Sequence, residues 1–172
     1  AKYPFQADLA RRFGADDLVE PDEKYEAAAR ITGAKLFNAP MNKGMLLGGF
    51  DVVYDCVGSA GTVEDGLRFA RAGGTVVLVG VDLRRMRLDL NPVWYQEVDL
   101  IGSQGHGMDA WQGRKRHTYD WVVDWLRSGK MRGDGIITHR FPFEEHRRAV
   151  DTAVSKARNK AVKIVFDYSL SV

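Results

Sequence analysis

Glycines divide residues 50–81 into a strand, a helix and a second strand, and this pattern constrains the fold more than any other part of the chain. The first apolar run, residues 50–57, is rich in valine and stops at Gly58, which is typical of a strand buried on both faces. The second run, residues 75–79, stops in the same way at Gly80. Two strands joined by one crossing helix run in the same direction. The sequence therefore predicts a parallel α/β unit.

The helix of this unit carries its own start and stop signals. Thr62 is a candidate N-cap, and Asp65 three residues later makes a weaker form of the capping box. The expected apolar stripe of the helix consists of Val63, Leu67 and Ala70. We expect Gly73 and Gly74 to end the helix, because glycine adopts the left-handed conformation that closes many helices.

Ligands of open parallel sheets bind beyond the carboxyl ends of the strands. The segments that follow the two predicted strands, residues 56–59 and 79–82, are therefore the expected place of a binding site. Cys56 lies at the end of the first strand, and a single cysteine in such a position predicts a small core residue rather than a metal ligand.

Composition excludes several classes of protein. The chain has 172 residues with 25 Lys and Arg against 23 Asp and Glu, and this balance indicates neither a nucleic acid nor a membrane surface as partner. One cysteine excludes an internal disulfide and a zinc site built from several cysteines. The sequence shows neither an apolar run of membrane-spanning length nor a signal-peptide pattern, which predicts a cytoplasmic protein.

Elements are also predicted outside the central unit. Helices are predicted at residues 5–13, 24–32, 114–127 and 144–156, and strands at residues 17–19, 98–103, 136–143 and 162–166. Residues 88–94 are expected to be extended at a sheet edge, because Pro92 cannot donate to a central ladder. Residues 34–49, with Pro40, predict a loop. Glycine is dense at residues 105–113, where the alternation of strand and helix ends, so we expect a domain boundary there.

A dinucleotide-binding sheet normally begins with a strand, a glycine-rich turn and a helix that together hold the pyrophosphate. This chain instead opens on residues 1–4, which look like the end of a second strand entering a second helix. Alone, such a sheet leaves one edge unpaired and exposes apolar faces. We therefore expect that another chain supplies the first unit or that the sequence is a fragment.

The sequence resembles the C-terminal part of a medium-chain dehydrogenase/reductase of the zinc-containing alcohol dehydrogenase type. The resembling segments are residues 6–16, 50–81, 91–103, 137–145 and 163–166. The resemblance implies a Rossmann-type, doubly wound parallel sheet that lacks its first strand-turn-helix unit. It further implies a partial NAD(P)-binding domain at residues 1–107, and a segment at residues 108–172 that returns to a catalytic domain.

The resemblance also implies which residues contact the cofactor. They are Ala1 and Lys2 at the end of the second strand, Val57, Gly58 and Ser59 after the first central strand, Val79, Gly80 and Val81 beside the nicotinamide, and Ser103 and Gln104 at its carboxamide. Family members that prefer NAD carry an aspartate at the place of Ala1. A small residue followed by a cation favours NADP over NAD, because the cation can face a 2′-phosphate.

The resemblance places the zinc and its ligands in an N-terminal domain outside this sequence, so we predict neither a catalytic nor a metal-binding residue here. The four histidines are at positions 106, 117, 139 and 146, and no pair of them has a compact ligand spacing on one element. His139 is expected to pack or cap near the domain boundary.

The leading hypothesis is the cofactor-binding and C-terminal portion of an NAD(P)-dependent, zinc-dependent oxidoreductase that acts on an alcohol or carbonyl compound and is inactive alone. One alternative is a zinc-free quinone or enoyl reductase of the same superfamily. Another is a non-catalytic Rossmann-like module whose sheet is completed by a partner. Residues 88–103 resemble the segment through which family members pair their sheets, which predicts a homodimer.

Overall fold

The computed structural model describes residues 2–38 and 44–170. The chain divides into two units, one formed by residues 22–105 and the other by residues 1–21 with residues 106–172. The domain limits predicted from the sequence, 1–107 and 108–172, stay a prediction.

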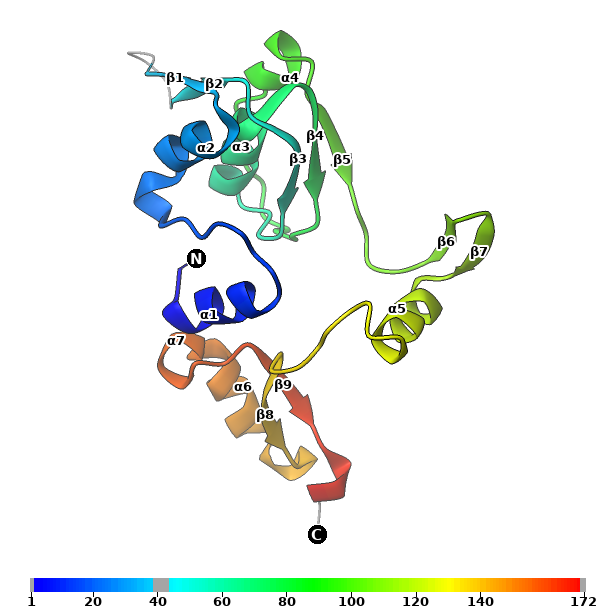
Figure 1. Cartoon of the computed structure of the whole chain (residues 1–172). Coiled ribbons are helices and arrows are strands. Elements are labelled where there is room, and N and C mark those ends of the chain that lie inside the picture. The colour runs from blue at the N-terminus through cyan, green and yellow to red at the C-terminus, as the bar shows by residue number, and fades with distance from the viewer. Residues whose placement is uncertain (1, 39–43, 171–172) are drawn as a thin grey trace. The chain divides into compact units, whose positions relative to one another are not determined.

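The unit of residues 22–105 holds the parallel sheet (Figure 1). Its elements are α2 (Lys24–Thr32), β1 (Lys35–Phe37), β2 (Met45–Leu47), β3 (Phe50–Asp55), α3 (Ala60–Phe69), β4 (Ala70–Leu78), α4 (Asn91–Tyr95) and β5 (Asp99–Gly102). Strands β3, β4 and β5 form one sheet in that order, and both pairs are parallel. The predicted parallel α/β unit is confirmed.

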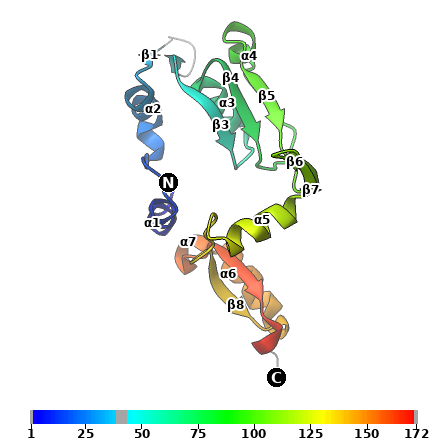
Figure 2. The same ribbon diagram turned by 45° about the vertical axis from the view of Figure 1, so that its right-hand side comes forward.

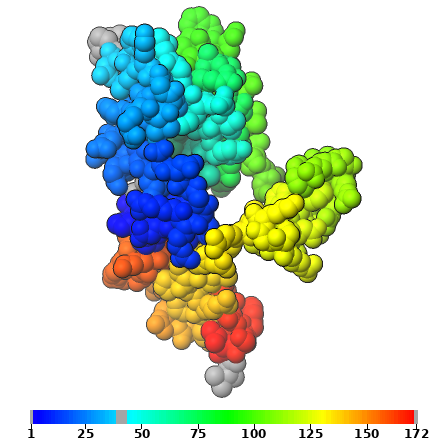
Figure 3. Space-filling model, in the orientation of Figure 1, coloured from blue at the N-terminus to red at the C-terminus, as the bar shows by residue number. Residues whose placement is uncertain are grey.

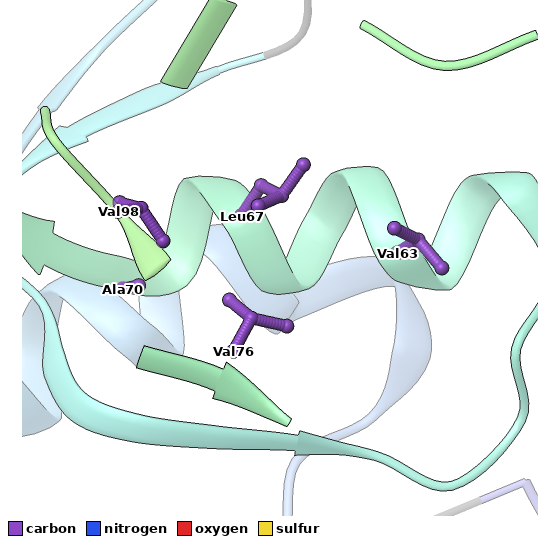
Figure 4. Packing of buried hydrophobic residues seen from close by; sticks show 5 residues of the cluster. All are labelled: Val63, Leu67, Ala70, Val76 and Val98. Carbon is purple, nitrogen blue, oxygen red and sulfur yellow. The ribbon is translucent and has the colours of Figure 1, made fainter. Parts of the chain in front are cut away.

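Helix α3 covers one face of this sheet, and the core lies between them (Figure 2). The core cluster consists of Val63, Leu67, Ala70, Val76 and Val98. Figure 4 shows Val76 between its strand and α3, the helix that carries Val63 and Leu67. The three stripe residues that the sequence predicted for the helix are thus all buried. In the space-filling view the segments of this unit pack side by side, from light blue to green (Figure 3).

Strand β3 is an edge strand of the sheet in the described part of the chain. Val52 and Tyr54 on this strand are 46% and 67% exposed, so the strand is not buried on both faces as its apolar sequence predicted. The physical reason is that α3 covers only the other face, toward which Val53 packs. The expectation of an unpaired edge with exposed apolar side chains is confirmed.

The second unit contains α1 (Pro4–Arg12), a hairpin, a longer helix and a small parallel pair. The hairpin consists of β6 (Met108–Trp111) and β7 (Arg114–His117), and the longer helix is α5 (Thr118–Arg127). The parallel pair consists of β8 (Ile137–Phe141) and β9 (Lys163–Phe166), and the helices α6 (His146–Val154) and α7 (Lys156–Asn159) connect them. Single-turn 3-10 helices occur at Pro21–Glu23, Phe143–Glu145 and Tyr168–Leu170. Strand β8 pairs with β9 in parallel, and α6 packs on β9.

Several predicted elements are confirmed. The helix predicted at residues 24–32 has those bounds, and the helix predicted at residues 5–13 is shifted by one residue. The strands expected at residues 98–103, 136–143 and 162–166 are present as β5, β8 and β9. The helix expected at residues 144–156 is α6 with a short turn on either side.

Other predicted elements are wrong. Residues 17–19 form no strand. The loop predicted at residues 34–49 contains the antiparallel pair β1 and β2, although Pro40 lies outside the described residues. Residues 91–95 are helical rather than extended, because a proline in the first turn of a helix has no amide hydrogen to lose. Residues 114–117 form the second strand of a hairpin, since Gln112 and Gly113 take positive φ angles of 50° and 73° and turn the chain back.

Helix α3 ends earlier than its glycines predicted. Its last residue is Phe69, and Ala70 already has an extended backbone with φ −71° and ψ 138°. Gly73 and Gly74 lie within β4, where Gly73 has φ +65° and its amide donates to the carbonyl oxygen of Gln96 at 2.8 Å. The glycine pair therefore bends a strand rather than closing a helix.

The core packing gives a first testable prediction. Leu67 is fully buried, so we expect Leu67→Ala to lower the free energy of unfolding by about 2–5 kcal/mol, through lost burial and the cavity left behind. Leu47→Ala removes the same atoms from a side chain that is 50% exposed, and it should cost only about 1 kcal/mol. Urea denaturation of the two variants measures the difference, and equal losses would contradict the assigned core.

Candidate site at the carboxyl ends of the parallel strands

The segments after β3 and β4 lie together at the carboxyl edge of the sheet. The backbone nitrogens of Val79 and Gly80 both donate to the carbonyl oxygen of Asp55, at 2.9 and 2.8 Å. Residues 56–59 therefore lie against residues 79–82. These are the two segments at which the sequence predicted a binding site.

Gly58 and Gly80 let the two segments touch backbone to backbone. A Cβ atom on Gly80 would lie 2.2 Å from the carbonyl carbon of Val57, and one on Gly58 would lie 2.6 Å from the carbonyl oxygen of Gly80. Gly58 also has φ +79°, a conformation that other residues rarely adopt. The two glycines therefore allow the backbones of the two segments to approach closely, in addition to allowing the chain to turn at each strand end.

The carboxylate of Asp55 holds the first segment in place. It accepts hydrogen bonds from the amide of Val57 at 2.9 Å, from the amide of Gly58 at 3.1 and 3.2 Å, and from the hydroxyl of Thr62 at 3.1 Å. Asp55 is only 6% exposed. Sequence reasoning missed this residue, although an acidic side chain that ends an apolar run just before a glycine turn was an available signal.

The N-cap of α3 is Ser59, not Thr62. The amide of Thr62 donates to the Ser59 hydroxyl at 3.4 Å, and the amide of Ser59 donates to the Thr62 hydroxyl at 3.1 Å, which makes a reciprocal capping box. Asp65, the expected partner of Thr62, instead accepts from the Tyr25 hydroxyl at 2.9 Å and pairs with Lys24. Burial and the bond to Asp65 raise the pKa of Tyr25.

Three valines at this edge present apolar surface to solvent. Val57, Val79 and Val81 are 60%, 41% and 78% exposed. Cys56 beside them is exposed too, so its expected role as a core residue is wrong. The side chain of Cys56 stays accessible because α3 covers the opposite face of β3.

The remaining predicted contact residues differ in where they lie. Ser103 follows β5, and its amide donates to the carbonyl oxygen of Leu78 at 2.9 Å, so Ser103 lies at the same edge as the two segments. Gln104 follows it and is exposed. Lys2 is exposed in the other unit, with its Nζ 5.5 Å from the ring centre of Tyr3, and Ala1 lies outside the described residues.

Asp82 ends the second segment and pairs with Arg84. Hydrogen bonds from the Arg84 side chain and amide lower the pKa of Asp82 to about 2. The guanidinium contacts both carboxylate oxygens, at 2.9 Å for Nε to Oδ1 and 2.6 Å for Nη2 to Oδ2. Asp82 is therefore a fixed negative charge at the rim of the segment.

The described residues do not fit a zinc centre. Within residues 2–38 and 44–170, no group of three or more His, Cys, Asp or Glu side chains could hold a metal ion. The rings of His106 and His117 lie 5.4 Å apart next to Tyr119, and His139 contacts the Thr138 hydroxyl at 3.0 Å.

Over the same described residues, no helix has the length and apolar character that crossing a bilayer requires.

Comparison with known proteins adds to this geometry. The chain is 31% identical over 163 residues to L-idonate 5-dehydrogenase of Vitis vinifera and 30% identical over 152 residues to D-arabinitol dehydrogenase 1 of Uromyces fabae. These matches cover 92% and 87% of the chain but only 39% and 38% of the relatives, so the chain spans about two fifths of their length.

Solved structures share the fold. A zinc-binding dehydrogenase from Sinorhizobium meliloti, described as bound to NADP, superposes with a TM-score of 0.65 at 24% identity. The match covers 96% of this chain and 43% of that structure. The family model described as zinc-binding dehydrogenase matches residues 2–128, about three quarters of the chain. The chain belongs to the zinc-binding dehydrogenase family.

Proposed function

We propose that this chain is the cofactor-binding and C-terminal portion of an NAD(P)-dependent, zinc-dependent dehydrogenase that oxidises an alcohol or reduces the matching carbonyl compound. In this proposal residues 1–107 belong to the cofactor domain and residues 108–172 return to the catalytic domain. The chain alone is then inactive, because the zinc ligands and most of the substrate pocket lie in the remaining part.

The observation that carries the proposal is the joined pair of segments at the carboxyl edge of the sheet. Gly58 and Gly80 touch, and Asp55 holds both segments, at the place where open α/β sheets bind their ligands. The unpaired edge of β3 also supports the proposal, because an exposed apolar edge strand is unfavourable and a further strand of the complete protein would cover it.

The chemistry of this edge fits a nicotinamide dinucleotide. Val57, Val79 and Val81 offer exposed apolar side chains against which a flat ring can pack, and Ser103 offers a polar group at the same edge, with Gln104 next to it in the chain. The bound cofactor would supply the hydride acceptor or donor. We propose NADP rather than NAD as the preferred form on the sequence resemblance alone, which equates Ala1 and Lys2 with the place where family members meet the adenosine ribose; a cation there can face a 2′-phosphate.

The curated relatives suggest a substrate class. The two relatives described above are named as dehydrogenases of L-idonate and of D-arabinitol, both polyhydroxy compounds. We propose a small polyhydroxy alcohol, or the corresponding ketone, as the substrate of the complete protein. A zinc-free quinone or enoyl reductase and a non-catalytic Rossmann-like module stay as alternatives.

The test joins this chain behind the part of the grape L-idonate dehydrogenase that precedes its matched region; we call the product the joined protein. We expect the joined protein to bind NADPH with an increase in nicotinamide fluorescence, to bind NADH more weakly, and to oxidise polyols. The 172-residue chain alone should show no turnover.

Each alternative predicts a different outcome. Turnover by the chain alone would contradict the proposal that it is inactive. Loss of binding of both NADPH and NADH in a folded joined protein would favour the non-catalytic module. The joined protein takes its N-terminal part from the grape enzyme, so it cannot decide between zinc-dependent and zinc-free chemistry. The presence or absence of zinc ligands in the reading frame upstream of this chain decides that question.

We also propose that the complete protein is a homodimer in the cytoplasm. Strand β5 forms the other edge of the described sheet, and it belongs to the segment of residues 88–103 through which pairing is expected. Analytical ultracentrifugation of the complete protein should give a dimer, and a monomer at micromolar concentration would contradict the assembly.

A further inference from the structure

Asp55 is a buried carboxylate at the centre of the candidate site. Three donors converge on its two oxygens, the amides of Val57 and Gly58 and the hydroxyl of Thr62, at 2.9 to 3.2 Å. A carboxylate accepts several hydrogen bonds at once, and such charge-assisted bonds are shorter and stronger than neutral ones. The side chain therefore determines the conformation of the segment that follows β3.

The backbone carbonyl of the same residue holds the second segment. It accepts from the amides of Val79 and Gly80 at 2.9 and 2.8 Å. One residue thus connects both segments of the site, the first through its side chain and the second through its main chain. A change in the side chain can disturb the first segment while the link to the second remains.

The negative charge also lies at the start of α3. Thr62 is the third residue of the helix and donates its hydroxyl to the Asp55 carboxylate, so the carboxylate lies next to the positive end of the helix dipole. The protein's own anion occupies this helix end. A cofactor phosphate would be repelled here, while an uncharged ring or ribose can lie against the exposed valines.

We propose that Asp55 is the positioning residue of the cofactor site: it fixes residues 56–59 in the conformation that binds the nucleoside part of the cofactor and keeps its phosphates away from α3. This inference rests on the proposed function for the identity of the ligand. The conformational part of it does not depend on any ligand.

The first experiment measures amide hydrogen exchange in the 172-residue chain without cofactor. Asp55→Ala should speed exchange at Val57 and Gly58 at least about tenfold, because their acceptor is lost. Asp55→Asn keeps one acceptor oxygen and should change these rates less than about threefold. Asp99→Ala is the control, an exposed aspartate on β5 that should leave both rates unchanged.

The second experiment measures NADPH binding by the joined protein. Asp55→Ala should weaken binding at least about tenfold, because the segment must then be ordered on binding, and Asp55→Asn should restore it to within about threefold. A merely structural role would change stability without this rescue of affinity. Unchanged affinity in a folded Asp55→Ala variant with fast exchange would overturn the inference.

Thr62→Val keeps the test informative if Asp55→Ala does not fold. It is close in shape but removes the hydroxyl that donates to Asp55 and accepts from the Ser59 amide. We expect faster exchange at Ser59 and about threefold weaker NADPH binding, and no change in either would overturn the inference. If the unsubstituted joined protein binds neither NADPH nor NADH, the proposed function fails, while the exchange experiment still tests the conformational role.

Discussion

Gly80→Ala is expected to lower the free energy of unfolding by about 3 kcal/mol or more, or to prevent folding. The added methyl group would lie 2.2 Å from the carbonyl carbon of Val57 and 2.4 Å from the backbone nitrogens of Val57 and Gly58. These are backbone atoms, so no side-chain rotation can relieve the overlap. The two segments would have to separate, which also breaks the bonds to the carbonyl of Asp55.

Gly61→Ala is the matched control for this prediction. Gly61 lies in the first turn of α3, and a Cβ atom there would meet nothing within 4 Å. Alanine is a better helix former than glycine, so this variant should be more stable by about 0.5–1 kcal/mol. Urea denaturation measures both. A Gly80→Ala variant as stable as the unsubstituted chain would show that the close approach at the site is wrong.

Arg68→Met is expected to cost about 3–5 kcal/mol, because it removes the buried cation that pairs with the carboxylate of Asp89. Arg68 is only 2% exposed although it lies on α3. Its guanidinium pairs with Asp89 and donates to the carbonyl oxygen of Glu64 at 3.1 Å. The Glu64 side chain in turn accepts from the amide of Asp89 at 3.1 Å, so the ion pair ties residues 82–90 to the helix.

The partner substitution separates the ion pair from packing. Asp89→Asn alone removes the carboxylate charge that pairs with the buried guanidinium and should also destabilise the chain, whereas Arg68→Met combined with Asp89→Asn should recover part of the loss. A double-mutant cycle in urea denaturation gives the coupling. Additive losses would mean that Arg68 and Asp89 stabilise the unit independently of each other.

The glycines that separate the apolar runs of residues 50–81 predicted the parallel unit, because strand ends and helix ends are set by residues close together in the sequence. Val63 and Leu67 follow helical spacing on α3, and both are buried in the core cluster together with Ala70, the first residue of β4. The segments at the two strand ends could also be located in advance, since the carboxyl ends of parallel strands meet at one edge of a sheet.

Features that depend on contacts across the fold were not predictable in the same way. At the end of α3, Gly49 packs closely against the carbonyl oxygen of Phe69, a contact between residues twenty positions apart. The hairpin at residues 108–117 depends on two positive φ angles at Gln112 and Gly113, and glutamine gives no such signal. The role of Asp55 depends on its hydrogen bond from Thr62, a residue that the sequence predicted only as a helix cap.

If residues 56–59 and 79–82 form one wall of a nicotinamide cofactor site, as we propose, a bound cofactor should shield Cys56. It is the only cysteine of the chain and its side chain is exposed at this wall. In the joined protein, the rate at which a maleimide modifies Cys56 can be followed by mass spectrometry of its peptide. We predict that saturating NADPH slows this modification at least about tenfold, since a bound cofactor covers the wall. An unchanged rate at a concentration where nicotinamide fluorescence shows full binding would place the cofactor elsewhere and contradict the claim.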